Sequence, residues 1–370
     1  MPKNILKIII VLALVYLFLF SIGLMGVAFK GFGKDFAENL IQTTSNPLVG
    51  LFIGILATSI VQSSSTTTSI VVGMVGSGVI SIANAVPIVM GANIGTTVTN
   101  TLVSIGHISR REEFKRAVGA ATVHDFFNIL CVAVLLPLEL LTGFLEKTAC
   151  KISSLCIGAG GIEFSSPIKA ITVPLIDLVK NLLLKINIPH ILIYILILAI
   201  ALTILFFSLF FIVRCMKSII AKRTEIILNN IIGKHGFLAI IAGLCFTSIV
   251  QSSSITTSLL VPLVAAGIIS VETVFPVTMG ANIGTTTTAI LASFATGNTA
   301  AVTIAFVHFL FNLTGVTCLY PLKPIRAIPI FLAKNLGELA FRRRRYVIIY
   351  VLTLFFAVPT ILIVVSKLLK

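Results

Sequence analysis

The chain alternates long apolar runs with short polar segments, which is the pattern of a protein that crosses a membrane many times. A membrane-spanning helix needs about 20 consecutive, mostly apolar residues. We expect such helices at 5–29, 85–107, 117–140, 188–213, 273–294, 301–320 and 346–367.

Two further stretches, 47–80 and 236–269, have a different pattern. Each consists of two apolar runs of roughly 15 residues separated by Gln-Ser-Ser-Ser, and one such run is too short to span a membrane. We interpret each stretch as a re-entrant helical hairpin. Its polar tip must then be covered by protein or line a water-filled cavity.

The polar segments occur twice along the chain. TSIVQSSSTTTS at 58–69 returns as TSIVQSSSITTS at 247–258, and MGANIGTT at 90–97 returns at 279–286. Both pairs are 189 residues apart, which indicates that one ancestral unit was duplicated. Because the apolar surroundings differ while these polar residues agree, we expect both copies to contribute to one shared site.

Composition excludes a soluble protein. Of the 370 residues, 57% are hydrophobic and 11% are charged, and the mean hydropathy is +1.13. The net charge of +15 does not indicate nucleic-acid binding, because the basic residues mostly lie at the ends of apolar segments. Lys3 and Lys7 precede an apolar run without an obvious cleavage site, so we expect the first helix to be retained.

Basic loops give the expected orientation. The positive-inside rule places clusters at 110–116, 214–223 and 323–345 in the cytoplasm. The first hairpin then enters from outside and the second from the cytoplasm. The expected fold is an all-α polytopic membrane protein with two inverted-topology repeats, each with a re-entrant hairpin and a broken transmembrane helix.

The expected order of segments follows from this topology. It comprises an N-terminal helix and outer connection (1–46), repeat 1 (47–140), an extracellular loop (141–187), a helix and cytoplasmic connection (188–235), repeat 2 (236–320), and a cytoplasmic basic segment with a C-terminal helix (321–370).

Several motifs resemble those of the type II sodium-dependent phosphate cotransporters. They are the paired QSSS and GANIGT motifs, AATVHDFFN at 120–128, HFLFN at 308–312 and YPLKPIRAIP at 320–329. The resemblance implies sodium-coupled symport of inorganic phosphate into the cell by alternating access, with both ions bound near the midplane between the hairpin tips. Sodium is the coupling ion, and no cofactor is expected.

Phosphate has to be bound here without Arg or Lys, through hydroxyls, amides and the positive ends of half-helices. The serines of both tips stand where the second arm of a hairpin begins, and Ser is a favoured N-cap. The residues assigned to phosphate are Ser63, Ser64, Ser65, Ser252, Ser253, Ser254, Asn93 and Asn282.

Sodium needs neutral oxygen atoms, including carbonyls freed where helices unwind. We expect Gly95 and Gly284 to interrupt their helices and to free such carbonyls. The residues assigned to sodium are Gln62, Thr96, Thr97, Gln251, Thr285, Thr286, Thr288 and Asp125. The alternative for the small hydroxyl residues is close helix packing.

Asp125 is the acidic residue deepest within an expected span, about 12 Å from its start. Ionisable side chains inside membrane spans are rare and usually have a function, so we expect one for this carboxylate. It either attracts sodium or pairs with His124 or a basic helix end. Comparison with the second copy does not distinguish these two roles, because Phe309 stands at the position that matches Asp125.

Other classes of function have less support. No Cys-x-x-Cys pair, His/Cys cluster or Ser-His-Asp order indicates a metal site or a hydrolase, so we expect no enzyme. The alternatives are a sodium-coupled carrier of another oxyanion or a dicarboxylate, and an ion channel. Lipid is an expected partner and a homodimer is one option. Cys150 and Cys156 are either a disulfide or two free thiols.

Overall fold

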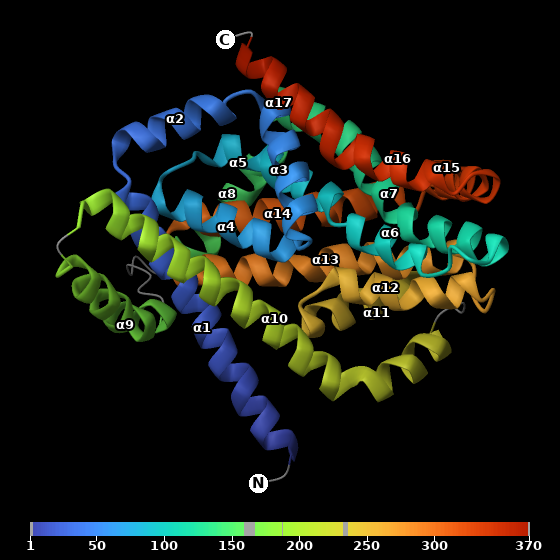
Figure 1. Cartoon of the computed structure of the whole chain (residues 1–370), viewed down its shortest axis with the longest axis horizontal. Helices are drawn as coiled ribbons and strands as arrows, with labels where there is room; N and C mark the ends of the chain where they lie inside the picture. The colour runs from blue at the N-terminus through green and yellow to red at the C-terminus, as the bar shows by residue number, and fades with distance from the viewer. Residues whose placement is uncertain (1–2, 159–166, 187, 232–235, 369–370) are drawn as a thin grey trace.

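The computed structural model describes residues 3–158, 167–186, 188–231 and 236–368, and the elements in these ranges are helices (Figure 1). The first half contains α1 (Lys3–Gly31), α2 (Lys34–Thr44), α3 (Pro47–Val61), α4 (Ser64–Ser77), α5 (Ile82–Gly95), α6 (Val98–Ile105), α7 (Arg111–Thr142), α8 (Phe144–Gly158) and α9 (Pro167–Leu184). The second half contains α10 (His190–Ile231), α11 (Gly236–Val250), α12 (Ser253–Ala265), α13 (Val271–Thr296), α14 (Thr299–Leu319), α15 (Lys323–Arg342), α16 (Arg345–Val351), the π-helix η1 (Leu352–Ala357) and α17 (Val358–Leu368).

The expected membrane spans coincide with long helices. Among the residues that the structure describes, six helical segments are long and apolar enough to cross a membrane, namely α1, α5–α6, α7, α10, α14 and α16–α17. The expected span at 273–294 is α13, a helix of 26 residues. Its many Thr residues and the Gly-Ala-Asn-Ile-Gly segment explain why it is not among the six.

Both hairpin stretches form two short helices with a sharp break at the Gln-Ser pair. In the first copy α3 ends at Val61 and α4 begins at Ser64, and in the second α11 ends at Val250 and α12 begins at Ser253. The expected positions of the breaks are therefore confirmed.

Only one of the two expected helix interruptions is present. The first copy breaks between Gly95 and Val98, which separates α5 from α6. In the second copy α13 continues through Gly284, so the expectation of freed carbonyls there is wrong. Gly284 instead permits close packing, because a Cβ at this position would lie 2.6 Å from the carbonyl oxygen of Leu244 in α11.

The segment 141–187, expected as a loop, contains the helices α8 and α9. The chain turns at Gly143, which has a left-handed φ of 64°, and the buried carboxylate of Glu139 accepts hydrogen bonds from the amides of Leu145 (2.6 Å) and Glu146 (3.2 Å). These bonds satisfy amides at the start of α8. The Cys150–Cys156 question lies outside the described residues, because the Cys156 side chain is not described.

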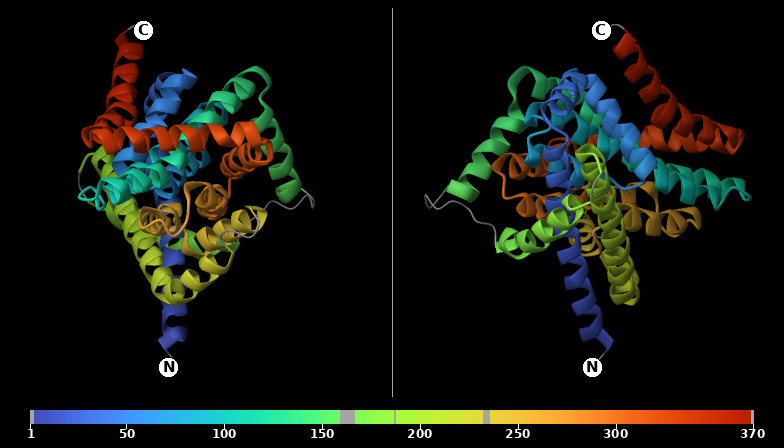
Figure 2. Two further views of the ribbon diagram at one scale, coloured as in Figure 1. Left: turned by 90° about the vertical axis from the view of Figure 1, so that its right-hand side faces the viewer. Right: turned by 60° about the vertical axis from the view of Figure 1, so that its left-hand side comes forward.

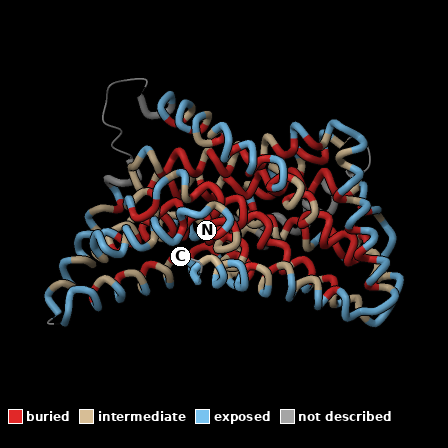
Figure 3. Tube along the Cα trace, turned by 90° about the horizontal axis from the view of Figure 1, so that it is seen from above, coloured by how far each residue is buried: buried red, intermediate tan, exposed pale blue. Residues whose placement is uncertain are grey.

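The main hydrophobic core contains residues of both copies of the repeated unit and also of α1 and α10. Buried residues concentrate in the middle of the molecule, whereas exposed residues follow the outer helices (Figure 3). Many exposed side chains are large and apolar, among them Ile60, Leu141, Phe237 and Ile268, as expected for surfaces that face lipid. The N-terminal end of α1 and the C-terminal end of α17 project from opposite sides (Figure 2).

Candidate functional site

The two Gln-Ser turns have nearly the same backbone geometry. Gln62 and Gln251 have left-handed φ angles of 60° and 61°, and they are the non-glycine residues with positive φ in the described part of the chain. Such a conformation costs free energy and persists when its surroundings fix it. Ser63 and Ser252, the next residues, share φ −153° and ψ 107°.

Both of these serines cap the helix that follows. Ser63 Oγ accepts a hydrogen bond from the amide of Thr66 (3.2 Å), and Ser252 Oγ accepts one from the amide of Ile255 (3.4 Å). The predicted N-caps are therefore confirmed. Figure 1 shows α4 and α12 extending to opposite sides from the centre, so their positive ends are both central.

One cavity of about 230 Å³ lies between the two turns. We call it the QSSS cavity, and its lining residues are Val61, Gln62, Ser63, Ser64, Ser65, Thr66, Phe206, Leu209, Phe210, Val213, Gln251, Ser252, Ser253 and Ser254. The structure thus brings together all six serines assigned to phosphate. No charged side chain belongs to this lining, and the volume far exceeds the roughly 10–15 Å³ that one water needs.

Each turn glutamine is held by a threonine. Thr99 Oγ1 donates to Gln62 Oε1 (2.8 Å), and Thr288 Oγ1 donates to Gln251 Oε1 (2.6 Å). The amide groups of the two glutamines donate to the carbonyl oxygens of Ser59 and Ser248. Sequence reasoning assigned Thr288 but missed Thr99, although Thr99 stands 189 residues before it, at the same offset as the motifs.

The other threonines assigned to sodium are buried and hydrogen-bonded within their own copy. Thr96 and Thr285 donate to the carbonyl oxygens of Ala92 (3.1 Å) and Ala281 (3.0 Å), and Thr286 donates to that of Ile283 (2.7 Å). Thr97 Oγ1 lies 2.7 Å from Nδ1 of His124, which is on α7. None of these four residues lines the QSSS cavity.

Asn93 and Asn282 also lie outside that lining, and each contacts the opposite copy. His308 Nε2 donates to Asn93 Oδ1 (3.1 Å), and Asn93 Nδ2 lies 3.3 Å from Asn312 Oδ1. In the matching arrangement, Asn282 hydrogen-bonds with His124 and donates from Nδ2 to Asn128 Oδ1 (2.8 Å). All of these side chains are buried, so the two copies share a polar network at the centre, in which Nδ1 of His308 has no hydrogen-bond partner.

Asp125 is fully buried and lies beside this network. Its Oδ2 accepts a hydrogen bond from the hydroxyl of Tyr350 in α16 (3.0 Å), whereas Oδ1 has no hydrogen-bond partner. Neither His124 nor a basic side chain is among the partners of this carboxyl group in the described residues. Sequence reasoning missed Tyr350, because nothing in the C-terminal helix points to a residue 225 positions earlier.

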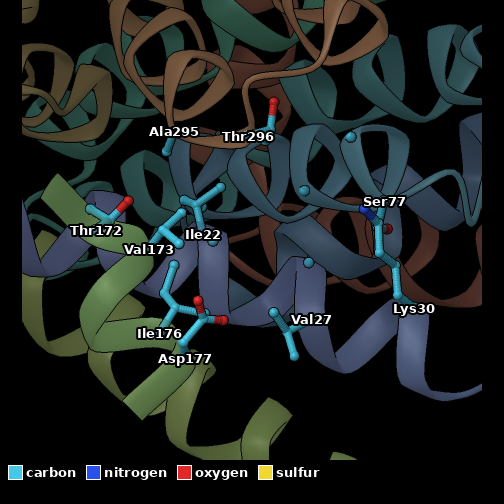
Figure 4. Close-up of a pocket in the computed structure, with 14 residues that line it drawn as sticks. Ile22, Val27, Lys30, Ser77, Thr172, Val173, Ile176, Asp177, Ala295 and Thr296 are labelled. Atoms are coloured by element: carbon cyan, nitrogen blue, oxygen red, sulfur yellow. The ribbon is translucent and has the colours of Figure 1, made fainter. Parts of the chain in front are cut away.

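A second cavity, of about 170 Å³, lies at the far end of α4. Residues of α1, α4, α9 and α13 line it, including the charged side chains Lys30 and Asp177 (Figure 4). It contains none of the residues assigned to phosphate or sodium.

The apolar helices, the paired turns and the shared cavity define a multi-pass helical membrane protein of the transporter class. The family model for Na+/Pi-cotransporters matches residues 17–165 and 204–328. The chain therefore belongs to the Na+/Pi-cotransporter family.

Characterised relatives cover nearly all of the chain. It is 34% identical to sodium-dependent phosphate transport protein 2A of Rattus norvegicus, over 98% of this chain and 68% of the relative. It is 33% identical to the 2B proteins of Pongo abelii and Homo sapiens, in each case over 95% of this chain and 64% of the relative. The chain thus spans about two thirds of the length of these relatives. No solved structure is significantly similar to it.

Proposed function

We propose that this protein is a sodium-coupled symporter that carries inorganic phosphate into the cell. The observation that supports it most is the QSSS cavity, where serines of two helix N-termini meet without any charged side chain. Helix N-termini and hydroxyl groups are suited to bind an anion. Weak neutral donors also let the anion leave again, as transport requires.

Within this proposal, phosphate binds to Ser63–Ser65 and Ser252–Ser254. Ser64 and Ser253 are buried, at 3% and 5% exposure, and each is the first residue of its helix. Their hydroxyls and the first amides of α4 and α12 are the donors that a central phosphate would meet. We propose that Asn93 and Asn282 hold the two copies together, because their side chains hydrogen-bond to residues of the opposite copy.

Sodium has two candidate places. The first is beside the Gln62–Thr99 and Gln251–Thr288 pairs, which offer neutral oxygens at the edge of the QSSS cavity. The second is near Asp125 and Thr97, at the break between α5 and α6, where a buried carboxylate oxygen has no hydrogen-bond partner. A cation beside a bound anion offsets the cost of its desolvation, which would couple the two species.

The transport step in this proposal is alternating access by inverted repeats. Its support is that α4 and α12 leave the cavity in opposite directions while the sequence motifs of the two copies agree. Matched half-helices that meet at a central site are typical of such carriers.

The experiment is uptake of radiolabelled phosphate by proteoliposomes that contain the purified protein. We expect accumulation with an inward sodium gradient and none with a potassium gradient. Sulfate, arsenate and succinate are added as competitors, and arsenate should compete best because its shape and charge are closest to those of phosphate. Equal uptake without sodium, or stronger competition by succinate than by arsenate, would reject the proposal.

A further inference from the structure

The QSSS cavity has one wall that is not polar. Phe206, Leu209, Phe210 and Val213 of α10 line this wall, beside the two turns. These positions are spaced i, i+3, i+4 and i+7, so they form a single face of the helix. We call them the α10 stripe.

The helix that carries the stripe packs against α1 over much of its length, as the shared core of the two helices shows. Near the end of α1, a Cβ on Gly31 would lie 2.2 Å from the ring of Tyr194 of α10. Helix α10 packs less extensively against the hairpins, mainly against α11 and only slightly against α4. The α10 stripe therefore belongs to a helix pair outside the two hairpins whose turns it faces.

The chemistry of the stripe sets what it can do. Its four side chains have no hydrogen-bonding group, so they contact the turns through dispersion forces alone. They cannot replace the water molecules that a sodium or phosphate ion would lose on contact with them, so they do not bind either ion. An apolar wall can also move along the hairpin tips without breaking a polar contact.

We propose that the α10 stripe, through Phe206 and Phe210, is the seal that keeps the sodium and phosphate fluxes coupled. The two rings line the side of the cavity that no polar group occupies, and they are 42% and 60% exposed. They keep water from forming a continuous path past the serines when the site is empty. This inference rests on the proposed symport, since it assigns a role to residues at the same site.

Phe210→Ala tests the seal, and Phe207→Ala is a matched control. Phe207 is on the same helix, is 50% exposed where Phe210 is 60% exposed, and does not line the cavity. Sodium flux without phosphate should rise about tenfold in Phe210→Ala, a change that corresponds to about 1.4 kcal/mol. The number of phosphate ions carried per sodium ion should fall in parallel, while Phe207→Ala should resemble the unmodified protein.

Two further substitutions at position 210 distinguish the loss of a seal from a general packing defect. Phe210→Leu restores an apolar side chain and should bring the phosphate-independent sodium flux back close to its original value, whereas Phe210→Ser should leak like Phe210→Ala. An unchanged sodium flux in Phe210→Ala, or an equal leak in Phe207→Ala, overturns the proposal.

A second measurement remains informative if Phe210→Ala does not fold. In a cysteine-free protein, Phe210→Cys should react more slowly with a small thiol reagent when sodium and phosphate are both present, whereas Phe207→Cys should not change. Absence of protection at position 210 overturns the seal. If the unmodified protein shows no sodium-driven phosphate uptake, the proposed function itself has failed, which is a different result from either of these.

Discussion

Thr99 donates a 2.8 Å hydrogen bond to Oε1 of Gln62, and this bond ties α6 to the tip of the first hairpin. Thr288 and Gln251 repeat it in the second copy at 2.6 Å. Because both glutamines have left-handed backbones, these bonds help to hold a turn conformation that is otherwise unfavourable.

Removal of either threonine hydroxyl should weaken sodium binding. Thr99→Val and Thr288→Val keep the shape of the side chain and delete one oxygen, at a cost of about 1 kcal/mol. We expect the half-saturating sodium concentration to rise roughly fivefold, and phosphate affinity to recover at saturating sodium. Thr287→Val is the control, because Thr287 bonds to Ser248 and not to a turn glutamine. A phosphate defect that saturating sodium does not repair would contradict the assignment.

Removal of a cavity serine should weaken phosphate binding at every sodium concentration. Ser64→Ala and Ser253→Ala each delete one donor, so the half-saturating phosphate concentration should rise roughly fivefold. Ser69→Ala is the control on α4, because the buried Ser69 hydroxyl has no hydrogen-bond partner and lies outside the cavity lining. Unchanged phosphate affinity in both variants would show that these serines serve helix packing and do not bind phosphate.

The network between the two copies should stabilise the protein. Asn282→Leu leaves the buried side chains of His124 and Asn128 without their partner, at a cost of about 1–3 kcal/mol for each unsatisfied group. We expect a lower Tm in detergent, and a similar loss for Asn93→Leu. If Asn93→Ser instead lowers phosphate affinity and leaves Tm unchanged, the asparagine binds the anion directly, as the sequence first suggested.

Chemical labelling from one side tests the inverted topology. In a cysteine-free protein, Ser109→Cys should react with an impermeant thiol reagent from the cytoplasm, and Thr299→Cys should react from outside. Thr299 is preferred to its neighbour Gly297, because Gly297 has a positive φ of 58° that a side chain would strain. Labelling of both positions from the same face would rule out the inverted repeats.

Glycine substitution tests how α11 packs on α13. A Cβ at Gly280 would lie 1.9 Å from the carbonyl oxygen of Ile240, so Gly280→Ala should destabilise the protein by about 1–3 kcal/mol or prevent folding. Gly26→Ala is the control, because a Cβ there meets nothing within 4 Å. It should be neutral or slightly stabilising, since Ala favours a helix more than Gly does. The measurement is thermal unfolding in detergent, and equal Tm values would refute the close contact.

The sequence by itself determined the local features of this protein. Apolar runs of sufficient length specified the membrane helices, because crossing a bilayer requires that length whatever the neighbouring helices are. The Gln-Ser pairs specified the breaks at the hairpin tips, and Ser63 and Ser252 cap the next helices through bonds three residues away. Each of these features depends on residues close together in the chain.

The tertiary structure decided which distant residues contact one another. The same Asn-Ile-Gly-Thr-Thr segment ends a helix after Gly95 but continues one through Gly284, so its conformation is not local. The contacts of Asn282 with α7, of Tyr350 with Asp125 and of the α10 stripe with the QSSS cavity all join distant segments. Such contacts arise when whole helices dock, and side-chain patterns along one segment do not specify which distant residue will face it.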